Sequence, residues 1–356
     1  MERALYYLFK YLVYKMEPKL DFSDVLVTPR SSSVGSRQEV YLTRTFKFKY
    51  SPYSLECVPL MAANMDTVGS IEMMRALSKC GVFTCLHKFI TLDEFRDNAE
   101  FMKGHLDFFA VTIGYSASEI DWLALVNDII DFKVICIDVA NGHLQGFVRF
   151  CKQIRDLYPE KIIIAGNVCT PEGVEALITD GQVDVVKCGI GGGSACTTRI
   201  KTGVGFPQFS AAAECSKVAR ELGASIVSDG GITCPGDAVK AFGVGADFVM
   251  IGGQFAGHTE TPGEIIEENN KFFKEFYGMS SERAMTKNYG GKKAYRTSEG
   301  RCMKIPYKGD VSDTLSDFLG GIRSACTYTD CKNIEAMTGG LDFIRVNHQY
   351  NQSLLR

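Results

Sequence analysis

The sequence predicts an α/β fold, a (β/α)8 TIM barrel with a lid segment after the eighth strand. Three observations support this prediction. Short apolar or β-branched segments recur along the 356 residues, and most of them start about two dozen residues apart. Such a spacing accommodates a strand, a loop and a crossover helix. Helical patterns lie between these segments, and polar or glycine-containing turns follow most of them, as expected at the ligand-binding end of a barrel.

The eight predicted strands are apolar segments rich in Val, Ile and Phe. In chain order they are Pro59–Ala63, Val82–Leu86, Phe108–Ile113, Lys133–Ile137, Lys161–Ala165, Asp184–Lys187, Ser225–Val227 and Asp247–Ile251. The clearest helices between them are Ser70–Lys79, Pro171–Thr179, Ser210–Leu222 and Cys234–Phe242. Pro235 suits the first turn of the last helix. An open doubly wound sheet is the alternative, but no Gly-x-Gly-x-x-Gly follows the first strand.

Polar residues follow the predicted strands, and in a barrel these positions share the C-terminal rim. They are Asn64, Asp66, His87, Lys88, Asp138, Asn141, Asn167 and Asp229. Any one of them could be a solvated or capping loop residue, but together they predict a binding rim. The last two strands end in the pairs Gly230-Gly231 and Gly252-Gly253. Because glycine amides at these two loops commonly bind phosphate, we expect a phosphorylated ligand.

One glycine-rich loop carries a cysteine. It reads Gly189-Ile190-Gly191-Gly192-Gly193-Ser194-Ala195-Cys196-Thr197-Thr198-Arg199. Glycine lets the backbone approach a ligand or an ion closely. Cys196 could be an exposed nucleophile whose thiolate the nearby Arg199 favours. It could equally be a small apolar residue in an ordinary turn. The loop alone leaves both interpretations open.

The composition is typical of a cytosolic globular protein, with 46% hydrophobic and 23% charged residues. The formal charge of −3 gives no sign of nucleic-acid binding. Thirteen cysteines without a Cys-x-x-Cys pair argue against a disulfide framework or a structural zinc site. The five histidines form no metal-ligand spacing. We therefore expect a cytoplasmic location, no nucleic acid and no membrane partner.

The two ends and one internal segment differ from the barrel pattern. Residues 1–18 predict a disordered extension, although Met1–Lys15 could instead form a surface amphipathic helix or precede a start at Met16. Residues 19–345 are expected to form one barrel domain, and residues 346–356 a tail. The long polar segment at about 271–310 is expected to form a lid over the rim.

Several longer motifs together resemble the IMP dehydrogenase and GMP reductase family, from about Lys19 to about Phe343. They are Leu20-Asp21-Phe22-Ser23-Asp24-Val25-Leu26, Ala63-Asn64-Met65-Asp66-Thr67-Val68-Gly69, Asp138-Val139-Ala140-Asn141-Gly142, Lys201-Thr202-Gly203-Val204-Gly205, Ser228-Asp229-Gly230-Gly231 and Lys308-Gly309-Asp310-Val311. The resemblance implies a TIM-barrel oxidoreductase of purine nucleotide metabolism. Their order and their spread over the whole chain make a chance match implausible.

Narrower motifs favour the reductase branch of that family. No room for a regulatory insertion lies between Leu86 and Phe108, and both the Cys196 loop and the segment Tyr295-Arg296-Thr297-Ser298-Glu299-Gly300 resemble the reductase pattern. Gly192 stands where the reductases usually have proline, and Thr297 where they usually have alanine. A dehydrogenase without the insertion is the alternative. A nucleotide-binding barrel without catalysis is another, which the presence of Cys196 and Glu299 disfavours.

The resemblance implies reduction of GMP to IMP by NADPH through a covalent intermediate on Cys196, in a homotetramer. The implied catalytic residues are Cys196, Thr198 and Glu299. The implied GMP-binding residues are Asp229, Gly230, Gly231, Gly252, Gly253, Gly278, Met279, Ser280, Arg296, Thr297, Ser298 and Gly300. The implied NADPH-binding residues are Ser36, Arg37, Lys88, Asp138, Val139, Ala140, Ile190, Gly191, Tyr295, Arg296 and, from a neighbouring subunit, Ser324, Ala325, Cys326 and Thr327. A monovalent cation such as K⁺ is implied at Gly191, Gly193, Cys196 and Arg199.

Overall fold

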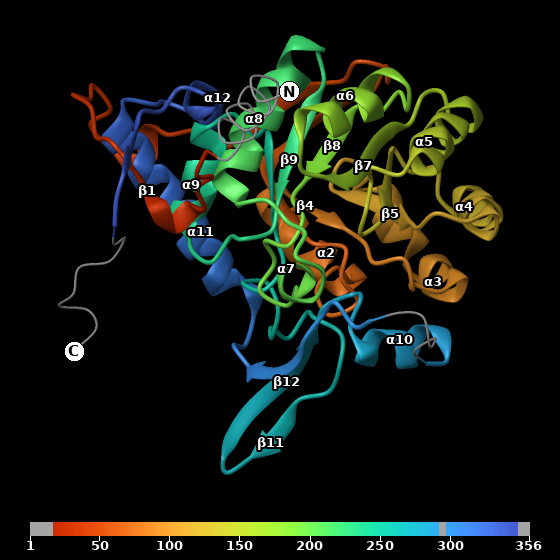
Figure 1. The fold of residues 1–356 in the computed structure, drawn as a ribbon. Helices are drawn as coiled ribbons and strands as arrows, with labels where there is room; N and C mark the ends of the chain where they lie inside the picture. Colours follow the sequence, from red (N-terminus) through yellow and green to blue (C-terminus); the bar gives the residue numbers. More distant parts are fainter. Residues whose placement is uncertain (1–16, 292–296, 348–356) are drawn as a thin grey trace, which may run out of the picture.

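Eight parallel strands form a closed barrel in the computed structural model, which describes residues 17–291 and 297–347 (Figure 1). They are β3 (Ser54–Ala62), β4 (Val82–Cys85), β5 (Phe109–Ile113), β6 (Val134–Asp138), β7 (Ile162–Val168), β8 (Val185–Cys188), β9 (Ser225–Asp229) and β10 (Phe248–Ile251). The barrel closes because β10 pairs with β3 in parallel, with Met250 opposite Met61. The predicted TIM barrel is confirmed, and the alternative prediction of an open doubly wound sheet is wrong.

Helices cover the outside of the barrel and return the chain from each strand to the next (Figure 1). They are α2 (Ile71–Leu77), α3 (Leu92–Lys103), α4 (Ala117–Ile129), α5 (Gln145–Leu157), α6 (Pro171–Thr179), α8 (Gln208–Glu221), α9 (Pro235–Gly243) and α11 (Val311–Thr329). Side chains cap several N-termini: Ser70 accepts from Met73 N–H, and Thr91 and Glu94 form a capping box. Among the helices in the described ranges, none is long and apolar enough to cross a membrane.

The side chains of each barrel strand point alternately into two apolar cores, and this explains why the strand sequences are continuously apolar. In β6, Val134 and Cys136 belong to the cluster inside the barrel, while Ile135 and Ile137 belong to the cluster beneath the helices. All four side chains are fully buried. Burying an aliphatic side chain stabilises the fold by about 1.5–3 kcal/mol, so both faces of each strand fix its register.

Several short elements were not predicted. The strand β2 (Arg44–Lys47) pairs antiparallel with the first residues of β3, so that β3 begins five residues earlier than the predicted strand. The strands β1 (Val25–Val27) and β14 (Phe343–Arg345) pair antiparallel and join the two ends of the described domain. The remaining short elements are η1 (Phe22–Asp24), η2 (Arg37–Glu39), η3 (Ser78–Cys80), α7 (Thr198–Thr202) and α12 (Ile334–Met337).

The segment after β10 forms a small antiparallel sheet that projects from the barrel (Figure 1). Its strands are β11 (Ile266–Glu268), β12 (Lys271–Tyr277) and β13 (Cys302–Pro306), and the helix α10 (Glu282–Tyr289) lies between the last two. The ordered structure therefore begins before the predicted lid boundary at 271. Exposed strands alternate polar and apolar residues, so this segment lacks the apolar runs of the barrel. We call residues 266–306 the lid.

Candidate active site

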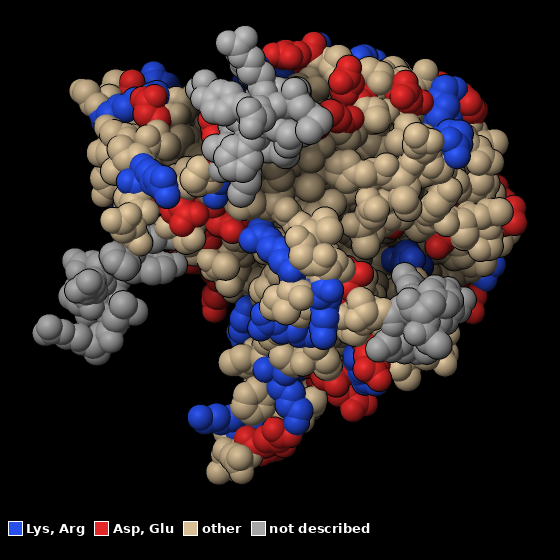
Figure 2. Space-filling model, viewed as in Figure 1, with Lys and Arg blue, Asp and Glu red and all other residues tan. Residues whose placement is uncertain are grey.

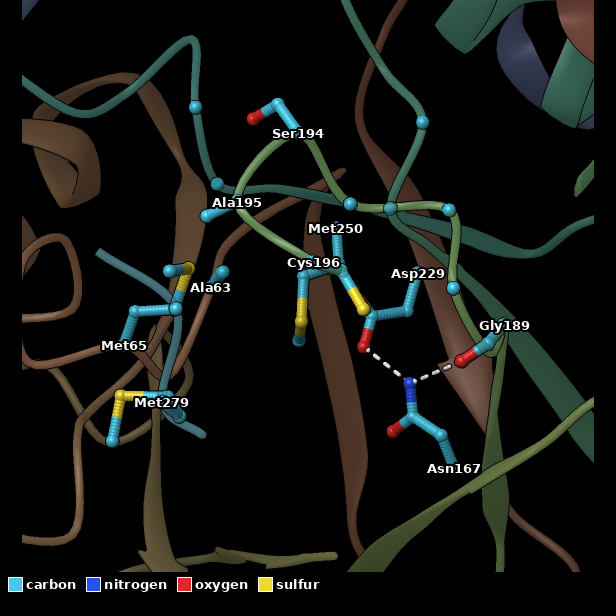
Figure 3. A pocket seen from close by; sticks show the side chains of 18 of the residues that line it. Ala63, Met65, Asn167, Gly189, Ser194, Ala195, Cys196, Asp229, Met250 and Met279 are labelled. Atoms are coloured by element: carbon cyan, nitrogen blue, oxygen red, sulfur yellow. Dashed lines mark hydrogen bonds between the residues drawn. The ribbon is translucent and has the colours of Figure 1, made fainter. Parts of the chain in front are cut away.

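A cavity of about 500 Å³ lies at the C-terminal end of the barrel, where the end of β7 and the loops after β3, β6, β8, β9 and β10 meet the lid. The lid contributes Phe276, Met279 and Glu299, among others, to its wall. Figure 3 shows the Cys196 side chain directed into this space, with Met65 and Met279 on one side and Asp229 with Asn167 on the other. The cavity therefore presents an apolar wall and a polar wall to a ligand.

A hydrogen-bonded chain links the cysteine to a carboxylate on the lid. The Cys196 thiol donates to Thr198 Oγ1 at 3.2 Å, and the Thr198 hydroxyl donates to Glu299 Oε2 at 2.8 Å. Backbone contacts hold the two segments together, since Thr197 N–H donates to the Glu299 carbonyl at 2.8 Å. Among the cavity-lining residues that the structure describes, Cys196 is the only cysteine. The three predicted catalytic residues thus lie side by side.

The cation nearest to the thiol in the sequence does not bind it. The Arg199 guanidinium pairs with Asp21 at 2.9 Å and donates to the Phe206 carbonyl at 2.6 Å. The Arg199 guanidinium is therefore held by Asp21 and by the Phe206 carbonyl, and any effect of its charge on the Cys196 thiolate stays a prediction. Asp21 lies 178 residues away in the sequence, so no local pattern revealed this pairing.

A buried lysine, which the sequence analysis did not select, organises the polar wall. Lys187 lies on β8 with 2% of its side chain exposed. Its ammonium donates to Asp138 and to Asn64 Oδ1 at 3.0 Å, and lies 3.3 Å from Asp229 Oδ2. Burial alone would lower the pKa of Lys187, but attraction to Asp138 and Asp229 outweighs it and holds that pKa well above its ordinary value. The sequence signal that could have identified Lys187 is its place inside an apolar strand, because a lysine is rarely buried without a partner.

Asp229 is held in place by a second donor. The Asn167 amide donates to Asp229 Oδ2 and to the Gly189 carbonyl, both at 2.8 Å (Figure 3). Asp229 therefore presents a carboxylate whose orientation is fixed from two sides, by Lys187 and by Asn167. A fixed carboxylate is suited to accept hydrogen bonds from a diol such as a ribose.

The glycine pairs predicted to bind phosphate line the same cavity. Gly230 and Gly231 have φ values of +93° and +76°, a conformation that L side chains rarely adopt. A Cβ on Gly253 would lie 2.7 Å from Ser194 Oγ. The Gly230-Gly231 turn therefore favours glycine, Gly253 packs closely against Ser194, and backbone amides without side chains in these turns suit an anionic group.

The predicted substrate residues fall into three groups. Those that line the cavity are Asp229, Gly230, Gly231, Gly252, Gly253, Gly278, Met279 and Ser280. Three residues do not line the cavity but lie on the adjacent lid segment: Thr297, Ser298 and Gly300. Thr297 is exposed, and the Ser298 hydroxyl donates to the Gly300 carbonyl at 3.2 Å. Arg296 lies outside the described residues.

The predicted cofactor residues are divided between the cavity and a second region. Those that line the cavity are Asp138, Val139, Ala140, Ile190 and Gly191. The element η2 begins at Arg37, directly after Ser36, and packs against α11. The helix α11 carries Ser324, Ala325, Cys326 and Thr327. None of these six predicted residues lines the cavity. The Cys326 side chain is buried in the core, and burial raises the pKa of its thiol to about 12. Tyr295 lies outside the described residues.

Lys88 also lies outside the cavity wall, at the junction of barrel and lid. Its ammonium is 3.9 Å from Glu119 Oε1 and 5.5 Å from the ring centroids of Phe89 and of Tyr289, which belongs to the lid helix α10. Lys88 is thus a partly enclosed cation with a carboxylate and two aromatic neighbours.

The residues predicted to bind a cation, Gly191, Gly193, Cys196 and Arg199, would offer backbone oxygens rather than acidic side chains. The Gly193 carbonyl accepts from Cys196 N–H at 3.0 Å, and the Arg199 carbonyl accepts from Gly203 N–H at 3.1 Å. Each carbonyl keeps a second lone pair, and rings of such oxygens suit a monovalent cation. Within residues 17–291 and 297–347, no cluster of three or more His, Cys, Asp or Glu side chains could hold a metal. The donor set fits K⁺ better than a transition metal.

The fold and the cavity define a TIM-barrel protein with a thiol-centred ligand site at the C-terminal rim. The model of the IMP dehydrogenase / GMP reductase domain matches residues 19–352, and the chain belongs to this family. The chain is 49% identical to GMP reductase 1 of Rattus norvegicus and to GMP reductase 2 of Homo sapiens, with 94% of this chain and 96% of each relative covered. It is 50% identical to GMP reductase of Buchnera aphidicola subsp. Schizaphis graminum, at the same coverage.

Proposed function

We propose that this protein is a GMP reductase, which converts GMP to IMP and ammonia with NADPH as the hydride donor. The observation that carries the proposal is the chain from Cys196 through Thr198 to Glu299, found in a cavity of nucleotide size. The identity of about half of all residues to several GMP reductases supports the same reaction. The presence of Cys196, Thr198 and Glu299 disfavours the alternative of a nucleotide-binding barrel without catalysis.

The two walls of the cavity suit a purine nucleotide. Asp229 would accept both ribose hydroxyls, and the amides at Gly230–Gly231 and Gly252–Gly253 would bind the phosphate. Met65 and Met279 would contact the base beside Cys196 (Figure 3). Lys and Arg side chains gather where the lid joins the barrel, between the places of α7 and β12, which favours an anionic ligand (Figure 2).

Catalysis begins with a carbon–sulfur bond between Cys196 and carbon 2 of the purine. The attacking group is the Cys196 thiolate, and Glu299, joined to Cys196 through the Thr198 hydroxyl by the observed hydrogen bonds, holds the proton that the departing amine needs. Glu299 gives this proton through the Thr198 hydroxyl to the exocyclic amine, which leaves as ammonia, and a thioimidate remains on Cys196. When bound, NADPH supplies a hydride to this carbon. The carbon–sulfur bond then breaks, the Cys196 thiolate leaves, and IMP is released. The lid excludes water, which would otherwise hydrolyse the thioimidate to XMP.

The cofactor would contact two sets of residues. Asp138, Val139, Ala140, Ile190 and Gly191 line the cavity and would face the nicotinamide end. Arg37 is exposed and makes no ion pair with any described residue, so it is free to bind the 2′-phosphate that distinguishes NADPH from NADH. Ser324–Thr327 lie outside the cavity, and the family resemblance implies that they reach the cofactor bound by a neighbouring subunit of a homotetramer.

Two further proposals concern the ion and the compartment. Carbonyls of Gly191, Gly193, Cys196 and Arg199 would hold a monovalent cation, which would fix the loop that carries the nucleophile. All thirteen cysteines are free thiols, as is common in a reducing compartment such as the cytoplasm.

The test is incubation of the purified protein with GMP and NADPH. The expected result is loss of the near-ultraviolet absorbance of NADPH, with IMP and ammonia formed in equal amounts. Replacement of K⁺ by a quaternary ammonium ion is expected to reduce the rate. Formation of XMP from IMP and NAD⁺, without GMP reduction, would identify a dehydrogenase instead. Binding of GMP without turnover would identify a non-catalytic barrel.

A further inference from the structure

We infer that Asp66, in the loop after β3, is a positioning residue that fixes the lid so that Glu299 meets Thr198. The inference rests on the proposed function, since it assigns a role within the proton relay. Asp66 is not a catalytic residue, because it does not line the cavity. Its side chain is 1% exposed, which is rare for a carboxylate unless donors surround it.

The described donors to the Asp66 carboxylate all come from the lid. Oδ2 accepts from the Tyr277 hydroxyl at 2.9 Å, from the Asn288 amide at 3.0 Å and from the Lys287 ammonium at 3.4 Å. The backbone N–H of Asp66 also contacts Met279 Sδ at 3.4 Å. A single buried carboxylate on the barrel therefore joins the end of β12 to the helix α10.

The protonation states of these partners keep the contact intact at neutral pH. Burial raises the pKa of Tyr277, so its hydroxyl remains a donor. The pKa of Lys287 is also raised; burial alone would lower it, but Tyr277 and Asp66 outweigh that effect. His87, on which the Asp66 charge also acts, stays neutral because burial lowers its pKa to about 4. Lys287 is therefore the cation that balances Asp66.

Short backbone links carry this anchor to the catalytic carboxylate. Tyr277 and Met279 belong to the run Tyr277-Gly278-Met279-Ser280, and the Ser280 carbonyl accepts from Glu299 N–H at 3.0 Å. Ser281 and Gly300 form a bridge pair, and Gly300 also pairs with Cys196. A shift of the segment that Asp66 holds would therefore move Glu299 relative to Thr198. Because misplacement of a catalytic group by about 1 Å can cost about a hundredfold in rate, this anchor is expected to matter for turnover.

The test compares two reactions in Asp66→Ala and Asp66→Asn. The full reaction, GMP with NADPH, needs a proton for ammonia. The partial reaction, IMP with NADP⁺, forms the thioimidate and NADPH and supplies no proton to an amine. We expect Asp66→Ala to lower kcat of the full reaction about 10- to 100-fold and the partial reaction less than about threefold. Asp66→Asn, which keeps one acceptor oxygen, should fall between Ala and wild type.

Controls separate positioning from folding. Arg283→Ala removes an exposed ion pair with Glu275 on the same lid, at 3.0 Å, and should change neither reaction. If Asp66→Ala does not fold, Tyr277→Phe removes one donor from the lid side and should lower the full reaction several-fold more than the partial one. Equal losses in both reactions, or no loss in either, would overturn the inference. Failure of the wild type to reduce GMP would instead overturn the proposed function.

Discussion

Replacing Lys187 by methionine tests the charge arrangement on which the polar wall depends. Methionine has a similar length but no charge, and the site leaves Lys187 2% exposed. The substitution would leave Asp138 and Asp229 facing each other without the ammonium that binds both. Removing one partner of a buried ion pair costs about 3–5 kcal/mol, because the remaining charge stays desolvated. We therefore expect Lys187→Met to lower the free energy of unfolding by about that amount.

Guanidinium unfolding followed by fluorescence of the single tryptophan, Trp122, measures this loss. Lys152→Met is the matched control, because Lys152 pairs with Asp156 on the exposed surface of α5 and should contribute less than about 1 kcal/mol. Adding Asp138→Asn to Lys187→Met should recover part of the stability, since it removes one of the two unpaired carboxylates. A loss no larger than that of Lys152→Met, or a further loss from Asp138→Asn, would refute the assignment.

A second check is the pH dependence of the difference in unfolding free energy between wild type and Lys187→Met. The folded-state pKa of Lys187 is raised above its unfolded value. Its stabilisation is therefore fully present below the unfolded pKa of about 10.4 and is lost only as the pH rises through the folded pKa. The stability difference between wild type and Lys187→Met should stay constant from about pH 6 to about pH 9. A difference that disappears within this range would indicate a neutral lysine.

Three further substitutions test the proposed roles. Cys196→Ala should abolish turnover and change GMP binding by calorimetry only a few-fold, because the ribose and phosphate contacts lie elsewhere; residual NADPH oxidation above about one percent would contradict its role. Glu299→Gln should slow the full reaction about a hundredfold or more, while the partial reaction from IMP and NADP⁺ persists; equal loss of both would exclude a proton relay. Arg37→Ala should weaken NADPH about 10- to 100-fold and leave NADH almost unchanged. An unaltered preference between the two cofactors, measured by their KM values, would contradict that contact.

The sequence by itself determined the barrel, because its signal is local. Each strand buries both faces, so Val185-Val186 or Ile162-Ile163-Ile164 stands out against the polar turns that follow. The same local signal located the rim residues and the glycine-rich loop of Cys196. The roles of Thr198 and Glu299 came from the family resemblance, since 101 residues separate them and no spacing rule connects them.

Only the tertiary structure decided which charged groups meet. Arg199 binds Asp21 rather than the adjacent thiol, Lys187 lies between Asp138 and Asp229, and Asp66 receives its donors from a lid more than 200 residues away. The physical reason is that apolar burial follows a periodic pattern along the chain, whereas an ion pair depends on the positions of two side chains in space. Closure of the barrel and docking of the lid set those positions, and the sequence around each charge carries no record of its partner.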